Sequence, residues 1–231
     1  ATFQRDGRRR RGRDMGVLVP EDFALGSLVN DSERRVVEAL RDGTSDSWLV
    51  LPDVAIWSRD RDFQLDVVLI HPTFGLVDLE VKGHRVQVVG GIWRSGDVDL
   101  KPQPITQAKD NAYALRNLLR SEVAGLANLH VNYGVAFPYV AELVGHLPIE
   151  VNEAQVLTAA DLDDPTDILE RLATSRWAGP MLTTETIEAI VAILRPDVEF
   201  SWDPGAQHRS SRARLDQLCA PIPVVGPDEP D

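Results

Sequence analysis

The sequence predicts an α/β fold in which helices flank a central mixed β-sheet. Over residues 30–140 the spacing of the apolar residues predicts, in chain order, a helix, three strands, a second helix and another strand. Helices and strands that follow one another in this way pack as layers around one core. The apolar fraction of 43% is sufficient for such a core in a chain of 231 residues.

The first predicted elements are one helix and three strands. "NDSERRVVEALRDG" indicates a helix, because Asn30 or Asp31 can cap its first turn and Gly43 lies just past its end. Apolar runs bounded by turn residues then predict three strands, at residues 47–57, 63–72 and 74–83.

A hairpin, a long helix and further elements follow. Gly90 and Gly91 suit the turn of a hairpin within residues 84–95. Pro104 suits the first turn of a helix over 104–123, in which apolar residues recur every three or four positions. "HVNYGVAFPYV" (130–140) predicts a buried strand. Beyond it, "QVLTAADL" predicts one more strand, and "DPTDILERLAT" and "TTETIEAIVAILRP" predict two more helices.

Charge and composition divide the chain into three parts. Residues 1–28 are a basic arm, 29–200 the folded domain, and 201–231 a Pro-rich linker or tail. The net charge is −12; residues 1–20 contribute +4 through six Arg and two Asp, so the remainder carries −16. An acidic body is unfavourable for binding nucleic acid unless divalent cations neutralise its carboxylates locally. The arm is either a solvated tail or a non-specific phosphate-binding segment.

The chain is expected to be soluble and cytoplasmic. Its single cysteine, Cys219, cannot form an internal disulfide, which favours a reducing compartment. There is no run of roughly 18 apolar residues that would span a membrane, and no apolar signal-peptide core. We therefore expect no membrane partner.

The strand-like segment "GLVDLEVKG" carries charges at every second position. Alternate residues of a strand share a face, so Asp78, Glu80 and Lys82 would point one way and the intervening apolar residues the other. Such a row is either the exposed face of a half-buried strand or one wall of a metal site. Carboxylates are suited to a hard divalent ion, and an adjacent lysine can stabilise charge that develops on a phosphoryl group.

Three more polar residues stand where the pattern favours apolar ones. Glu33 lies on the apolar face of the first helix, although its distance from Asn30 also fits a capping box. Asp66 interrupts the apolar run "QLDVVLI"; it is either a paired or ion-bound carboxylate or one satisfied by backbone amides. Gln107, in the first turn of the second helix, either flanks the apolar stripe toward the sheet or is an ordinary exposed residue.

Taken together, these residues resemble the PD-(D/E)xK nucleases, and more narrowly the nuclease-related domain (NERD) family. The resemblance covers about residues 31–140, with weaker similarity to about 175. Its segments are "SERRVVEAL", "VLPDVAIW", "FQLDVVLIHPTFGLVDLEVKG", "GGIWRS", "KPQPITQAKDNAYALRNLL" and "YGVAFP". One position departs from the family pattern: Asp78 stands where such strands are usually apolar. It is expected either to add a third acid to the site or to lie at the solvent end of the strand.

The resemblance implies a restriction-endonuclease-like core and a phosphodiesterase site that depends on Mg²⁺ or Mn²⁺. Asp66 and Glu80 would be the metal ligands, and Lys82 would orient or activate the hydrolytic water. Glu33 would assist from the first helix, and Gln107 would orient the water or contact the substrate. The expected function is hydrolysis of phosphodiester bonds in nucleic acid, and DNA is the expected substrate.

The alternative is a non-catalytic module on the same fold that binds nucleic acid or protein and serves a fused or partner helicase. The acidic body favours this alternative modestly. "SSRARLDQLCA" (210–220) resembles the entry to the helicase domain of longer proteins that begin with a nuclease-related domain.

Overall fold

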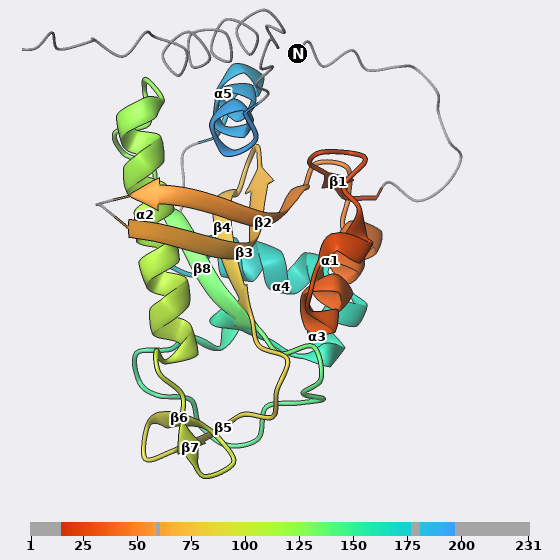
Figure 1. Cartoon of the computed structure of the whole chain (residues 1–231), viewed down its shortest axis with the longest axis vertical. Coiled ribbons are helices and arrows are strands. Elements are labelled where there is room, and N and C mark those ends of the chain that lie inside the picture. Colours follow the sequence, from red (N-terminus) through yellow and green to blue (C-terminus); the bar gives the residue numbers. More distant parts are fainter. Residues whose placement is uncertain (1–14, 59–60, 177–180, 197–231) are drawn as a thin grey trace, which may run out of the picture. The chain divides into compact units, whose positions relative to one another are not determined.

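The central feature of the computed structural model is a six-stranded mixed sheet with the strand order β1-β2-β3-β4-β8-β9 (Figure 1). The structure describes residues 15–58, 61–176 and 181–196. The strands of the sheet are β1 (Val17–Leu18), β2 (Leu49–Ser58), β3 (Arg61–His71), β4 (Gly75–Val81), β8 (Val131–Ala136) and β9 (Val156–Leu157). Neighbours among β2, β3 and β4 are antiparallel, while β1–β2, β4–β8 and β8–β9 are parallel. The predicted mixed α/β fold is confirmed.

Helices cover both faces of this sheet (Figure 1). They are α1 (Asp31–Gly43), α2 (Pro104–Glu122), α3 (Ala159–Asp163), α4 (Pro165–Thr174) and α5 (Thr184–Leu194). Apolar residues of α1, α3 and α4 share one buried cluster with Val67, Val77 and Leu79 of the sheet. Those of α2 and α5 share a second cluster with Val68 and Leu76. None of the helices in the described part combines the length and apolar character needed to cross a bilayer.

A small three-stranded sheet projects from the end of β4. It consists of β5 (Gln87–Val89), β6 (Ile92–Ser95) and β7 (Val98–Asp99). Gly90 and Gly91 connect β5 to β6 with φ values of +59° and +82°, which is the conformation that a two-residue hairpin turn requires. The predicted hairpin is therefore confirmed. Trp93 anchors it to the main domain by stacking on Phe137, with 5.5 Å between the ring centroids.

Three local features differ from the sequence predictions. Val17–Leu18, which the sequence places in the N-terminal arm, pairs with β2 as an edge strand. In "QVLTAADL" only two residues form a strand, because the Thr158 N–H donates to the Asp161 carboxylate at 2.8 Å and starts α3. Gly43 is the last residue of α1, where an added Cβ would lie 2.5 Å from a carbon of Pro165. The basic stretch before residue 15 and the tail from 201 lie outside the described residues.

A bend in the β2–β3 hairpin shapes the site. Phe63, Leu65 and Val68 of β3 all belong to the cluster on the α2 side, so the alternation of faces breaks between Leu65 and Val68. Opposite this break, Asp53 of β2 has φ +55°, a rare conformation for a residue other than glycine. The outer half of the hairpin consequently extends toward α2 (Figure 1). Asp66 stands at the bend.

Candidate active site

The strand β4 separates apolar from charged side chains onto its two faces. All seven of its residues are buried. Val77, Leu79 and Val81 pack in the cluster formed with α1 and α4. Asp78 and Glu80 therefore lie on the face toward α2. Lys82 follows directly, with its backbone N–H donating to the carbonyl of Ala136 at 2.9 Å.

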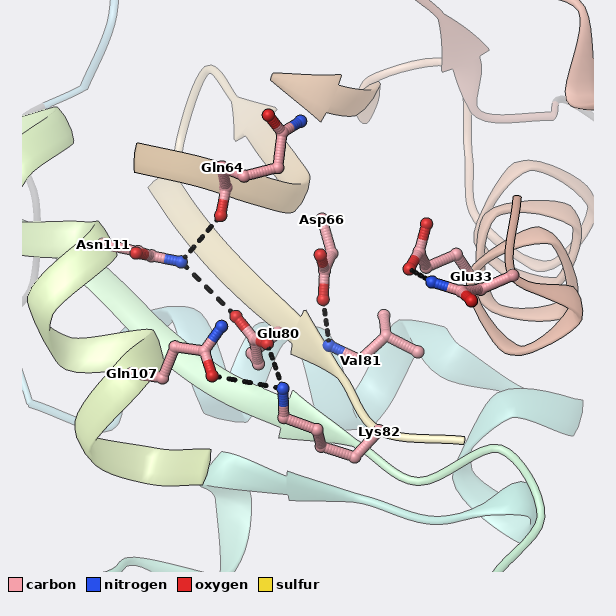
Figure 2. Close-up of polar contacts among 9 residues, drawn as sticks. Glu33, Gln64, Asp66, Glu80, Val81, Lys82, Gln107 and Asn111 are labelled. Atoms are coloured by element: carbon pink, nitrogen blue, oxygen red, sulfur yellow. Dashed lines mark hydrogen bonds and ion pairs between the residues drawn. The ribbon is translucent and has the colours of Figure 1, made fainter. Parts of the chain in front are cut away.

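Glu80 and Lys82 form the centre of a hydrogen-bonded cluster (Figure 2). The Lys82 ammonium donates to Oε1 of Glu80 at 2.6 Å and to Oε1 of Gln107 at 3.1 Å. The Glu80 side chain is 2% exposed and that of Lys82 is 20% exposed. The Lys82 side chain is thus partly accessible to solvent, while its carboxylate partner stays buried.

Asp66 joins this cluster at the point where the β3–β4 ladder ends. The last backbone pair of that ladder is Val67 with Leu79. Beyond it, the Val81 N–H donates to Oδ2 of Asp66 at 2.7 Å, so the carboxylate replaces the backbone carbonyl that β3 would otherwise have supplied. In the same register Asp66 comes opposite Glu80. Two buried or half-buried carboxyls therefore face one another.

Both carboxyls have a raised pKa, and burial is the largest cause in each case. Burial and the charge of Glu80 raise the pKa of Asp66 to about 7, against the opposing effect of the Val81 N–H. Burial also raises the pKa of Glu80, although Lys82 and a hydrogen bond to Asp66 oppose that shift. Without a cation the pair thus favours retaining a proton near neutral pH. A divalent ion would remove this strain by replacing the proton.

Glu33 approaches the same carboxyls from α1 (Figure 2). Its negative charge contributes to the raised pKa of both Asp66 and Glu80. Asn30 is the N-cap residue but makes no side-chain cap bond; its side-chain amide instead donates to the Glu33 carboxylate. The structure therefore contradicts the interpretation of Glu33 as part of a capping box. All five predicted site residues lie around one point at the end of β4.

Asn111 is part of the cluster, and the sequence analysis did not include it. Its side-chain amide donates to Oε2 of Glu80 at 3.3 Å and to the carbonyl of Gln64 at 3.1 Å (Figure 2). The residue is 6% exposed and lies one helical turn beyond Gln107. The sequence does contain a signal that could have identified this residue, because Asn111 is a polar residue within the apolar stripe between Ala108 and Ala112.

Asp78 lies deeper on the same face than Glu80. It is fully buried, so the expectation that it could lie at the solvent end of the strand is wrong. Neither of its carboxyl oxygens has a hydrogen-bond partner among the described residues. Burial first, and then the charges of Glu80 and Asp66, raise the pKa of Asp78 well above its usual range. Within the described residues, no group of three His, Cys, Asp or Glu residues is arranged to hold a metal.

Two cavities of the described structure do not include the predicted site residues. One, of about 320 Å³, lies between β6, β7 and the start of α2, and its lining includes Trp93 and Thr106. The other, of about 220 Å³, lies between β5 and residues 140–147. None of the five predicted residues lines them.

Comparison with known proteins gives one match. Residues 29–138 match the model of the family described as "Nuclease-related domain" (NERD). That range includes β2, β3, β4 and α2 and all residues of the cluster described above. No curated protein and no solved structure gives a significant match.

Proposed function

Because residues 29–138 match the family model of the nuclease-related domain, we propose that the cluster around Asp66, Glu80 and Lys82 hydrolyses phosphodiester bonds in nucleic acid, with DNA as the expected substrate. The observation that carries the proposal is the junction of β3 and β4. Two carboxyls and one ammonium meet there, and they are largely shielded from water.

The donor set fits Mg²⁺ or Mn²⁺. Asp66 and Glu80 offer carboxyl oxygens, which hard divalent ions prefer. Their raised pKa values indicate that the site favours an added positive charge. When bound, such an ion polarises the phosphoryl group and lowers the pKa of the attacking water.

Lys82 is suited to position the attacking water and to neutralise negative charge on the phosphate. Glu80 and Gln107 hold its ammonium from two sides, at 2.6 and 3.1 Å, and fix the direction of its remaining proton. Asn111 in turn holds the other oxygen of Glu80, which limits rotation of that carboxylate. Gln107 and Asn111 thus act through Lys82 and Glu80 as positioning residues.

A binding module without catalysis is the second candidate, and the charge of the chain favours it. Outside residues 1–20 the net charge is −16, which opposes the approach of a polyanion. Such a module would bind nucleic acid, or a helicase partner, without cleaving. Cleavage assays separate the two functions directly.

The test is cleavage of supercoiled plasmid and of labelled single-stranded DNA with Mg²⁺, with Mn²⁺ and with EDTA. We expect cleavage only with a metal, and a decrease of about 100- to 1000-fold in Lys82→Ala. Lys101→Ala is the matched control, because it removes a lysine that is exposed and lies outside the cluster. Folded protein that cleaves no substrate under any condition, or Lys82→Ala protein that cleaves as fast as the parent, would contradict the nuclease function.

A further inference from the structure

An exposed aromatic ring adjoins the residue that follows Lys82. Tyr139 is 51% exposed. A Cβ added to Gly83 would lie 3.9 Å from Cε2 of Tyr139 and only 2.7 Å from the Ser32 hydroxyl. Gly83 thus lets the chain after Lys82 pass between the start of α1 and the Tyr139 ring. The Tyr139 ring therefore lies beside the residue that follows Lys82 in the chain.

An unpaired arginine lies over the same ring. The guanidinium carbon of Arg35 is 5.4 Å from the centroid of Tyr139, a cation–π distance. Its neighbour Arg34 forms an ion pair with Asp31, whereas Arg35 has no carboxylate partner among the described residues. Arg35 is exposed on α1. Its charge is thus available to an anion that approaches the ring.

We propose that Tyr139 and Arg35 form a subsite for an unpaired nucleotide beside the bond that is cleaved, and that the substrate is therefore single-stranded. A base stacks on the Tyr139 ring, and Arg35 contacts an adjacent phosphate. Stacking of this kind needs a base whose face is free, which a base inside a duplex does not offer. Arg35 also supplies a positive charge to an acidic domain, and such a charge can contact the phosphates of nucleic acid. The inference rests on the proposed function for the identity of the neighbouring site.

Another Tyr–Arg pair, on α2, serves as an internal control. Arg116 lies 4.4 Å from the ring centroid of Tyr113 on α2. Tyr113 is 36% exposed, and its ring meets the ring of Tyr133 edge-on, with 6.4 Å between the centroids. The same chemistry at this position should not affect the substrate. Comparing the two pairs therefore separates a subsite from a general effect of removing Tyr or Arg.

The experiment measures binding in the full chain that carries Lys82→Ala, so that cleavage does not consume the ligand. Fluorescence anisotropy with Mg²⁺ gives Kd for a labelled single strand and for the same sequence as a blunt duplex. We expect Tyr139→Leu to weaken single-strand binding roughly 5- to 100-fold, the range found for loss of one stacked base. Duplex binding should change less than twofold. Tyr139→Phe, which keeps the ring, should bind the single strand like the parent.

Arg35→Gln should weaken single-strand binding and reduce the slope of log Kd against log salt by about 0.7, as expected for one phosphate contact to a single strand. Tyr113→Leu and Arg116→Gln should leave both Kd values unchanged. Thermal melting of every variant confirms folding.

Four outcomes distinguish this inference from the nuclease proposal. If the parent cleaves DNA but Tyr139→Leu binds single strands normally, the subsite is wrong and the nuclease function stands. If the parent cleaves nothing but binds single strands through Tyr139, the subsite stands and the nuclease function fails. An equal loss in Tyr113→Leu, or no binding of nucleic acid at all, would overturn the subsite.

Discussion

The two faces of β4 differ in what they bury. Toward α1 and α4 the strand presents Val77, Leu79 and Val81, which pack among other apolar side chains. Toward α2 it presents Asp78 and Glu80, which are equally buried. Burying a carboxyl costs free energy unless it is paired, whereas burying an apolar side chain stabilises the fold. The apolar face therefore stabilises the fold, while the face with the carboxyls gives up stability and, under the proposed function, holds the catalytic cluster.

The strongest test of this difference between the two faces substitutes one residue on each face, in separate variants. Glu80→Gln removes the charge that holds Lys82, and we expect metal-dependent cleavage to fall by about 1000-fold. The melting temperature should stay the same or rise, because the pKa of Glu80 is raised in the folded protein. Cleavage rates and thermal melting of the same preparation measure both effects.

Leu79→Ala is the matched variant on the opposite face. Leu79 is 0% exposed, and truncating such a side chain costs about 2–5 kcal/mol in the free energy of unfolding. Cleavage well below the melting temperature should remain near that of the parent. If Leu79→Ala lost cleavage while still folded, or if Glu80→Gln lost stability instead, the two faces would not divide stability and function in this way.

The same contrast explains which parts of the site the sequence could predict. The sequence predicts Glu80 and Lys82 because charged residues alternate with apolar ones in this strand, and such alternation is a local pattern. Asp66 was visible as a carboxylate within an apolar run. The bend at Asp66 was not, since it depends on Asp53 in another strand and on the packing of α2. Asn111 escaped because a single polar residue on a helical stripe becomes informative only once α2 is placed over Glu80.

The helices and strands also differ in how far the sequence alone predicts them. The helices and long strands carry enough periodic residues to be identified alone. Val17–Leu18 has only two residues, and only the edge of β2 makes it a strand. In the segment after Gln155, the hydrogen bonds between Thr158 and Asp161 outweigh the strand tendency of the preceding residues.

A second test of the comparison uses pH, with Asp66→Asn as the variant. The folded protein holds the Asp66 proton up to a pKa of about 7, while the unfolded chain releases it near 4. The stability of the metal-free parent therefore falls as pH rises from 4 to 7, because folding then requires either the proton or a buried charge. The side-chain amide of the Asp66→Asn variant does not titrate in this range, and its oxygen can still accept from the Val81 N–H.

The unfolding free energy of Asp66→Asn minus that of the parent should thus be near zero at pH 4 and approach about 3–4 kcal/mol above pH 7. Urea denaturation with EDTA at a series of pH values measures this difference. Excess Mg²⁺ should reduce it, since an ion bound to the parent compensates the buried charge. A difference that stayed constant with pH would mean that the carboxyl pair is not strained in the folded state.

The smallest expected effect concerns Asp78, the carboxyl that shares the face of Glu80 but lacks its partners. Asp78→Val places a β-branched apolar residue of similar size in the strand, and we expect it to raise the free energy of unfolding by about 1–3 kcal/mol at pH 7. The gain should shrink toward pH 4, because the raised pKa of Asp78 destabilises the parent only at pH values at which the unfolded chain has released that proton. Asp78→Asn is the control, since it removes the charge but leaves an unpaired polar group, and it should gain less than Asp78→Val. Urea denaturation of the three proteins at both pH values supplies the comparison, and cleavage rates are measured beside it. Should Asp78→Val prove stable but inactive, Asp78 would belong to the reactive site despite its depth, and that site would extend down the α2 face of β4 beyond Glu80.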